Sequence, residues 1–240
     1  MFDGRRVLVV VPARGGSKGV KLKNLREVGG VPLVALAGHV ARKLPWVDRA
    51  IVSTDHAGIA RVAQEAGLDC PFMRPEDISG SIISDWQVLI HALTEIERVD
   101  AKTYDIMVML QPTSPGRTPA HVTGAVTHLV QNDFDSVWTV SETDSKSHPL
   151  KQLIVSGAGQ LSYYDSAGAG VVARQQLAPV YHRNGIAYAM TRQCLTVQKS
   201  ILGKKPGAVV IEGLLPNIDT ELDLLWANFL AAQNKMDTVP

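Results

Sequence analysis

The chain has 240 residues, which suits one domain with a modest insertion and is too short for two large independent domains. Apolar residues make up 45% and charged residues 20%, which excludes a disordered, collagen-like or coiled-coil chain. The formal net charge is +1, so the total charge gives no reason to expect a nucleic-acid partner or an anionic membrane. The sequence contains no run of about 18 apolar residues, and we expect no membrane span.

The two cysteines, Cys70 and Cys194, are too few for a disulfide framework and lack the spacing of a metal-binding pair. They predict unpaired thiols in a reducing compartment. The apolar run Val7–Val11 is too short, and too soon followed by Arg14, to be a secretory signal. We therefore expect a cytoplasmic protein.

Short apolar runs alternate with helical patterns along the chain. The first run, Val7–Val11, has the uninterrupted apolar character of a central parallel strand that is covered on both faces. Strands are predicted at 7–11, 50–53, 106–110, 136–140 and 209–211. Helices are predicted at 57–66, at 84–98, and from Thr118-Pro119 to about Val130. This alternation favours a three-layer α/β/α sandwich with a mostly parallel sheet.

Two further features complete the organisation of a single domain that spans residues 1–240. The stretch at about 144–183 is rich in Ser, Gly and Gln and is too long for a routine connection, so we expect an inserted subdomain. The last helix begins at a capping box formed by Thr220 and Asp223. The apolar residues that share one face of this helix are Leu222, Leu225, Trp226 and Phe229.

Positive charge is concentrated near the N-terminus. Residues 1–50 carry ten Lys and Arg against three Asp and Glu, and five of these cations lie between Arg14 and Arg26. They surround three glycines in a loop that follows the first predicted strand, where parallel sheets bind ligands. The glycines would let the backbone approach a ligand, while Arg14, Lys18 and Lys23 could meet phosphate oxygens. The pattern predicts a polyphosphate-binding loop.

Other motifs offer competing interpretations of this loop. The loop lacks the Gly-Lys-Ser/Thr order of a Walker A loop and the G-x-G-x-x-G of a dinucleotide site. Elsewhere, Gly168–Ala173 fits the variant G-x-G-x-x-A, but no apolar strand precedes it, so we treat this match as a coincidence. Gly15–Gly19 fits G-x-S-x-G, the nucleophile elbow of α/β-hydrolases, with Ser17 as the nucleophile. A serine hydrolase has no use for the flanking cations. A serine hydrolase that uses Ser17 nevertheless stays open as the alternative function.

Several segments, in order, resemble the CMP-sialic acid synthetases (acylneuraminate cytidylyltransferases), including the legionaminate and pseudaminate types. They are 11–19 with Lys23-Asn24, 51–55, 110–115, 148–151, 174–177, Asn184-Gly185 with Tyr188, and 218–224. The resemblance implies a nucleotide-diphospho-sugar-transferase-like fold and transfer of CMP from CTP to the anomeric hydroxyl of a nonulosonic acid. It also implies Mg²⁺, no organic cofactor, and a homodimer whose inserted arm reaches into the neighbouring site.

The same resemblance implies roles for individual residues. Arg14, Lys18 and Lys23 would be catalytic, stabilising charge on the α-phosphate and the departing pyrophosphate. The implied nucleotide contacts are Ala13, Gly15, Ser17, Asn24, Arg74 and Ser84. The implied sugar contacts are Gln111, Lys151, Arg174, Asn184 and Tyr188. From the residues alone, Ser84 could equally cap a helix, Tyr188 could belong to the core, and Lys151 could lie on the surface.

The implied metal site departs from the family pattern. The family usually has Asp-Ile-Asp-Thr where this chain has Asn217-Ile218-Asp219-Thr220. Alternate residues of an extended segment face the same side, so Asp219 would be the only charged ligand of the pair, with Asn217 offering an amide oxygen. Mg²⁺ would then depend more on the CTP phosphates. A non-catalytic nucleotide binder that lost metal competence through Asn217 is a third hypothesis.

Overall fold

A computed structural model describes residues 1–233 and 235. The chain divides into two compact units. We call residues 1–139 together with those from 184 onward the main unit, and Val140–Arg183 the inserted unit. The sequence placed an insertion at about 144–183, inside the range of the inserted unit. Each unit is described by itself.

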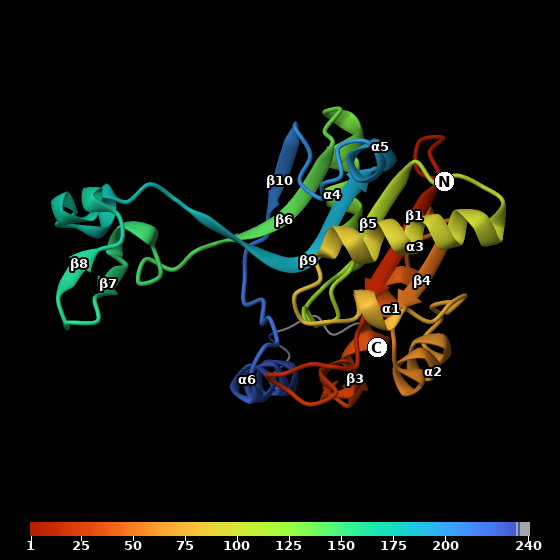
Figure 1. The fold of residues 1–240 in the computed structure, drawn as a ribbon, viewed down its shortest axis with the longest axis horizontal. Helices are drawn as coiled ribbons and strands as arrows, with labels where there is room; N and C mark the ends of the chain where they lie inside the picture. Colours follow the sequence, from red (N-terminus) through yellow and green to blue (C-terminus); the bar gives the residue numbers. More distant parts are fainter. Residues whose placement is uncertain (234, 236–240) are drawn as a thin grey trace. The chain divides into compact units, whose positions relative to one another are not determined.

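A six-stranded sheet forms the centre of the main unit, with the strand order β10-β6-β9-β5-β1-β4 (Figure 1). The central strand β1 pairs in parallel with β4 and β5, whereas β9 pairs antiparallel with β5. The strands are β1 (Val7–Pro12), β4 (Arg49–Ser53), β5 (Ile106–Met109), β6 (Ser136–Glu142), β9 (Tyr181–Thr191) and β10 (Pro206–Val210). All five predicted strands are present in this sheet, and its sixth strand, β9, contains residues 186–190, where the apolar pattern of the sequence resumes after the insertion.

Helices cover both faces of this sheet. They are α1 (Leu33–Arg42), α2 (Ala57–Glu65), α3 (Asp85–Asp100), α4 (Pro119–Gln131) and α5 (Arg192–Thr196), whereas α6 (Glu221–Ala232) packs on a separate cluster. Val7, Val9 and Val11 of β1 belong to a core cluster shared with α1, α2 and α4. Leu8 and Val10 belong to a second cluster shared with α3 and α5. Alternate side chains of one strand therefore fill two separate cores, which confirms the α/β sandwich.

Local signals in the sequence set several helix boundaries. Thr118 caps α4, with Pro119 at the first helical position, as predicted. Thr220 and Asp223 form the predicted capping box at the start of α6. Shorter elements connect the main layers: β2 (Glu27–Val28), β3 (Val31–Pro32) and the 3₁₀ turns η1 (Lys23–Leu25) and η2 (Glu76–Ile78).

The inserted unit has almost no core of its own. It contains an antiparallel hairpin, β7 (Leu153–Val155) with β8 (Leu161–Tyr163), and three 3₁₀ turns, η3 (Pro149–Lys151), η4 (Ser166–Gly170) and η5 (Arg174–Gln176). All six residues of the two hairpin strands are exposed. Among its residues, only His148 and Gly168 are buried. An isolated two-stranded hairpin is marginally stable in water, and the apolar residues of this hairpin are exposed.

The last helix buries a different face from the one that the apolar pattern singled out. Leu224, Ala227 and Leu230 are the buried residues of α6, and they join a third core cluster with Val28 and Leu33. The four residues grouped by the sequence, Leu222, Leu225, Trp226 and Phe229, share the exposed face instead. The helix is apolar on both sides, so the spacing alone could not show which side faces the core. No helix among the described residues is long and apolar enough to cross a membrane.

Candidate nucleotide-binding site

The glycine-containing loop leaves the end of β1 and is fixed by neighbouring backbone and side-chain groups. The Ala13 N–H donates to the carbonyl of Ser53 (2.9 Å), and the Gly15 N–H donates to Asp55 Oδ1 (2.7 Å). Asn24 is buried, and its side-chain amide donates to the carbonyl of Arg14 (2.9 Å). These contacts hold the loop against the end of β4, at the edge where parallel strands present their carboxyl ends.

The internal bonds of the loop limit which amides can serve a ligand. The Ser17 N–H donates to the carbonyl of Gly15 (3.0 Å), so the amides of Ala13, Gly15 and Ser17 are all engaged within the protein. Gly16 is exposed, and a Cβ there would meet nothing within 4 Å. Of the three loop glycines, Gly15 therefore has its N–H engaged within the protein and not free for a ligand.

Close approach to other segments explains two of the glycines. A Cβ on Gly19 would lie 2.2 Å from the carbonyl oxygen of Asp219, far inside van der Waals contact. A Cβ on Gly15 would lie 3.0 Å from Cβ of His56. Gly19 thus lets the loop touch the segment that holds the predicted metal ligand, across 200 positions of sequence.

The three predicted catalytic cations differ in their surroundings. Lys23 is largely covered, and its Nζ donates to the carbonyl of Ile218 (2.7 Å) and to Asp219 Oδ1 (2.9 Å). Arg14 Nη1 donates to the carbonyl of Gly80 (2.7 Å). Lys18 is exposed. Of the three cations, Lys23 contacts the Asp219 segment, Arg14 contacts the backbone at Gly80, and Lys18 faces solvent.

Arg74 places a further positive charge beneath this loop. It is buried, with Nε donating to Ser53 Oγ (3.1 Å) and Nη2 donating to the Ser53 carbonyl. Burial lowers the pKa of Arg74 to about 10, the Asp55 carboxylate partly offsets this, and the Arg14 charge lowers it further. Arg74 therefore lies close enough to Asp55 and Arg14 for their charges to act on it.

Ser84 has a complete structural explanation as the N-cap of α3. Its Oγ accepts from the Gln87 N–H (3.3 Å), and its own N–H donates to Gln87 Oε1 (3.1 Å), which completes a capping box. A nucleotide contact by Ser84 stays a prediction.

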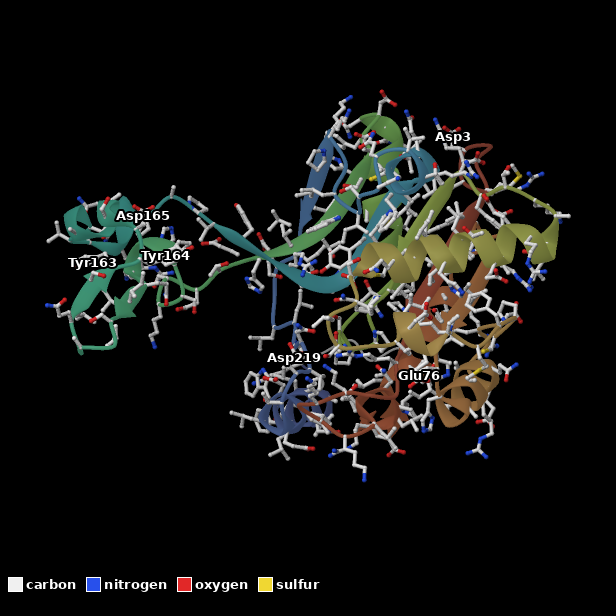
Figure 2. The ribbon with its side chains drawn as sticks, viewed as in Figure 1. Asp3, Glu76, Tyr163, Tyr164, Asp165 and Asp219 are labelled. Carbon is white, nitrogen blue, oxygen red and sulfur yellow. The ribbon has the colours of Figure 1, made fainter. Side chains whose placement is uncertain are left out.

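Asn217 and Asp219 lie on one side of their segment, as the alternation predicted. Between them, Ile218 is buried and its N–H donates to the Thr113 carbonyl (2.8 Å). Asn217 Nδ2 lies 3.4 Å from Asp219 Oδ2, and the Asp219 side chain is 69% exposed beside the start of α6 (Figure 2). Asp223 is engaged in capping, because its Oδ2 accepts from the Asp219 and Thr220 N–H groups (3.0 and 2.7 Å).

The side chains of Asn217 and Asp219 can be compared with the ligands that Mg²⁺ requires. The described residues contain no group of three or more His, Cys, Asp or Glu side chains placed to hold an ion. One exposed carboxylate with an adjacent amide oxygen fits Mg²⁺ only where phosphate oxygens and water supply the remaining ligands, a common arrangement at nucleotide sites. The residues present therefore fit a metal that is shared with a nucleotide.

Three of the predicted sugar contacts meet around Gly185. Gln111 follows β5 and is half-buried. Asn184 is buried, and its Oδ1 accepts from Thr139 Oγ1 (2.7 Å) and the Ile186 N–H (3.2 Å). The buried Tyr188 accepts the Gly185 N–H at its hydroxyl (2.8 Å) and belongs to the second core cluster. Lys151 and Arg174 are exposed residues of the inserted unit.

The path of the chain after Ser17 does not fit a nucleophile elbow, in which the serine sits on a tight turn between a strand and a helix. After β1, the chain passes through an irregular loop and the short η1, and the first α-helix begins only at Leu33. The G-x-S-x-G match is therefore a coincidence of spacing.

Comparison with known proteins identifies the family. The model of the family described as Cytidylyltransferase matches residues 8–210. The chain belongs to this cytidylyltransferase family. It is therefore a nucleotidyltransferase, which confirms the resemblance seen in the sequence and removes the hydrolase alternative.

Two curated relatives match this cytidylyltransferase over nearly their whole length. The chain is 30% identical over 231 residues to a CMP-N,N'-diacetyllegionaminic acid synthase of Legionella pneumophila, covering 92% of this chain and 94% of the relative. It is 26% identical over 228 residues to a pseudaminic acid cytidylyltransferase of Campylobacter jejuni, covering 95% and 97%. A CMP:2-keto-3-deoxy-manno-octonic acid synthetase solved with CTP has the same fold (TM-score 0.68, 18% identity, 95% and 99% covered).

Sequence reasoning missed two residues that shape the site of this cytidylyltransferase. Asp55 anchors the glycine loop through Gly15, and its position just after the 50–53 strand was a usable signal. Arg117 is buried and donates to the carbonyls of Gln111, Gly185 and Ile186. Burial lowers its pKa to about 9, and the nearby Tyr188 hydroxyl opposes this. In the sequence, Arg117 lies just before the helix cap Thr118, and nothing in that position indicates that its side chain is buried.

Proposed function

We propose that this cytidylyltransferase transfers CMP from CTP to the anomeric hydroxyl of a nonulosonic acid and releases pyrophosphate. The observation that carries the proposal is the junction between the glycine loop and the 217–219 segment. There, Gly19 contacts the Asp219 backbone and Lys23 contacts its carboxylate. The names of the two relatives, one acting on legionaminic acid and one on pseudaminic acid, support an acidic nine-carbon sugar as acceptor.

The junction suits the charge changes of nucleotidyl transfer. Negative charge grows on the α-phosphate and the leaving pyrophosphate, and fixed cations that already face the phosphates stabilise it without rearrangement. We assign this role to Arg14, Lys18 and Lys23. The Ser17 hydroxyl and the backbone around Gly16 supply the phosphate contacts, because the amides of Gly15 and Ser17 are engaged inside the loop. Ala13 and Asn24 shape the loop, while Arg74 and Ser84 border the nucleotide.

Mg²⁺ completes the proposed site. Asp219 would hold it, Asn217 would contribute weakly, and the CTP phosphates would supply further ligands. When bound, the metal neutralises phosphate charge and acidifies the attacking hydroxyl. Lys23 Nζ lies on Asp219 Oδ1 and Asn217 Nδ2 faces Oδ2, so N–H groups address both carboxylate oxygens and the segment by itself offers a metal few ligands. We therefore expect the metal to enter with CTP.

The proposed acceptor contacts come from Gln111, Asn184 and Tyr188 of the main unit and, separately, from two cations of the inserted unit. Gln111 binds sugar hydroxyls, and Asn184 and Tyr188 shape the Gly185 turn beside it. Lys151 and Arg174 provide the cations that a sugar carboxylate requires. We propose that they do so across a homodimer, because the inserted unit lacks a core and needs a second copy to cover it. A cytoplasmic location agrees with two unpaired cysteines and with a nucleotide substrate.

Pyrophosphate release from CTP and Mg²⁺, measured against a panel of nonulosonic acids, tests the proposal. The expected result is release that requires both CTP and one member of the panel, with formation of the CMP-sugar. A fluorophosphonate probe should leave Ser17 unlabelled. Tight CTP binding with no release for any acceptor would overturn the proposal and leave a nucleotide-binding protein without turnover.

A further inference from the structure

A largely buried loop, residues 111–117, carries the proposed sugar contact Gln111 at its start. It follows β5 and ends at Arg117, immediately before Thr118, the cap of α4. Ser114 and Arg117 are each only 2% exposed, although serine and arginine usually lie on the surface. Buried polar side chains are normally hydrogen-bonded, so the contacts of these two residues show what holds the loop in place.

Arg117 fastens the start of this loop to the Gly185 turn, residues 184–186. Its Nη2 donates to the carbonyls of Gln111 (2.5 Å) and Gly185 (2.9 Å), and its Nε donates to the carbonyl of Ile186. A guanidinium is planar and its N–H groups point in fixed directions. One side chain therefore fixes the backbone at Gln111 relative to the backbone of the turn.

The turn itself is shaped to receive the Gln111 side chain. Gly185 has a φ of +74°, and a Cβ there would lie 2.8 Å from Gln111 Oε1 and closer still to Ser114 Oγ. Ser114 Oγ also donates to the Asn184 carbonyl (2.8 Å), which is a second bond between the loop and the turn. The place of the Gln111 amide thus depends on this close approach, which the Arg117 bonds maintain.

The middle of the same loop supports the proposed metal segment. The Thr113 carbonyl accepts from the Ile218 N–H (2.8 Å), and Ile218 lies between Asn217 and Asp219. The loop therefore carries the sugar contact at one end and, two residues later, the anchor of the metal segment. A shift of the loop would move the acceptor relative to the metal, and transfer depends on that alignment.

The buried charge of Arg117 is a poor device for stability alone. Burial lowers its pKa to about 9, so the guanidinium is still protonated at neutral pH and keeps its N–H donors. Removing a charged group from water is costly even where it is hydrogen-bonded, and apolar side chains often fill such space with no loss of stability. What this guanidinium adds is a fixed position for three carbonyl groups.

We propose that Arg117 is a positioning residue for the acceptor, which acts through the Gln111 backbone and the Gly185 turn to hold the Gln111 side chain in place relative to the Asp219 segment. The inference rests on the proposed function. The contacts of Arg117 lie on the 111–117 loop and the Gly185 turn, whereas the glycine loop would hold CTP. Loss of these contacts should therefore impair acceptor binding and spare CTP binding.

The kinetics of Arg117→Lys test this separation. The variant keeps the charge and replaces the planar fork with a single ammonium group. With a nonulosonic acid that supports pyrophosphate release by wild type, the acceptor KM should rise at least tenfold, while the KM for CTP stays within threefold. Partial unfolding would instead lower kcat and leave both KM values unchanged. An acceptor KM within threefold of wild type would overturn the proposal.

Arg192→Lys is the matched control for the kinetics. Arg192 also makes a two-bond fork, with the Glu97 carboxylate (2.9 and 3.0 Å), and it follows the end of β9 that pairs with the start of β5. The Gly185 turn lies near the other end of β9. Arg192→Lys should therefore leave both KM values within threefold of wild type, and an equal rise in its acceptor KM would overturn the proposal.

A double variant tests whether Arg117 acts through Gln111. Residues that act through one contact have non-additive effects. Adding Arg117→Lys to Gln111→Ala should therefore raise the acceptor KM less than twofold beyond that of Gln111→Ala alone. If the two single effects multiply in full, Arg117 acts independently of Gln111 and the proposal fails.

Hydrogen exchange separates failure of this inference from failure of the proposed function, because it needs no substrate. In Arg117→Lys, the amides of Gly185 and Ile218 should exchange at least tenfold faster, while those of Gly15 and Ser17 keep their wild-type rates. Unchanged rates at Gly185 and Ile218, or an equal increase at all four amides, would overturn the inference. Wild type that releases no pyrophosphate with any acceptor would overturn the proposed function, and the exchange rates would still decide whether Arg117 holds the loop to the turn.

Discussion

Gly19→Ala perturbs the junction between the glycine loop and the metal segment by a single methyl group. The new Cβ would lie 2.2 Å from the Asp219 carbonyl oxygen, against an ordinary carbon–oxygen contact beyond 3 Å, so one segment must move by about 1 Å. The oxygen belongs to the backbone, and the neighbouring Ile218 carbonyl accepts from Lys23, so the shift would carry Lys23 and the Asp219 carboxylate with it. A misplacement of about 1 Å can cost about 100-fold in rate.

We therefore expect Gly19→Ala to lower kcat/KM for CTP about 100-fold, equivalent to about 2.7 kcal/mol of transition-state stabilisation. The assay is the initial rate of pyrophosphate release over a range of CTP concentrations, with thermal unfolding to show that the variant is folded. Gly16→Ala is the matched control in the same loop, because its Cβ would meet nothing within 4 Å, and it should stay within threefold of wild type. Activity of Gly19→Ala within threefold of wild type would refute the reasoning, as would an equal loss in Gly16→Ala.

Three further predictions follow from the side chains. Asp219→Ala should reduce turnover at least 100-fold with a nearly unchanged unfolding midpoint, because its 69% exposed side chain contacts Lys23 and Asn217 and fills no part of the core; retained activity would remove it from the metal site. Asn217→Asp should lower the Mg²⁺ concentration for half-maximal activity severalfold, and an unchanged value would count against a metal shared with CTP. Burial alone would raise the pKa of Glu97, but Arg192 and the Tyr104 N–H hold it below its usual value. The stabilisation that the ionised Glu97 carboxylate gives to the folded state is therefore present at neutral pH and is lost as the pH falls through the folded-state pKa of Glu97. Glu97→Gln should thus lower the unfolding free energy by about 1 kcal/mol at pH 7, and urea titrations should show the difference vanishing in acid.

Local patterns predicted the framework because they act over a few residues. The uninterrupted apolar run of β1 marked a strand covered on both faces, and the caps at Thr118 and Thr220 marked helix starts. The bounds of β9 could not be predicted because the strand begins at Tyr181 inside the irregular segment, whereas the apolar pattern resumes only near Ile186. The resemblance to a known family then named the glycine loop and the 217–219 segment as parts of one site.

The sequence by itself determined the strands, the helix caps, the positive loop and the family. The tertiary structure decided which of these meet: Lys23 contacts Asp219 although 196 positions separate them, and Arg117 is buried under the Gly185 turn. It also decided which face of α6 enters the core and which stays exposed. The physical reason is that backbone preferences and capping are set by near neighbours, whereas contact and burial depend on the order in which distant strands and helices pack.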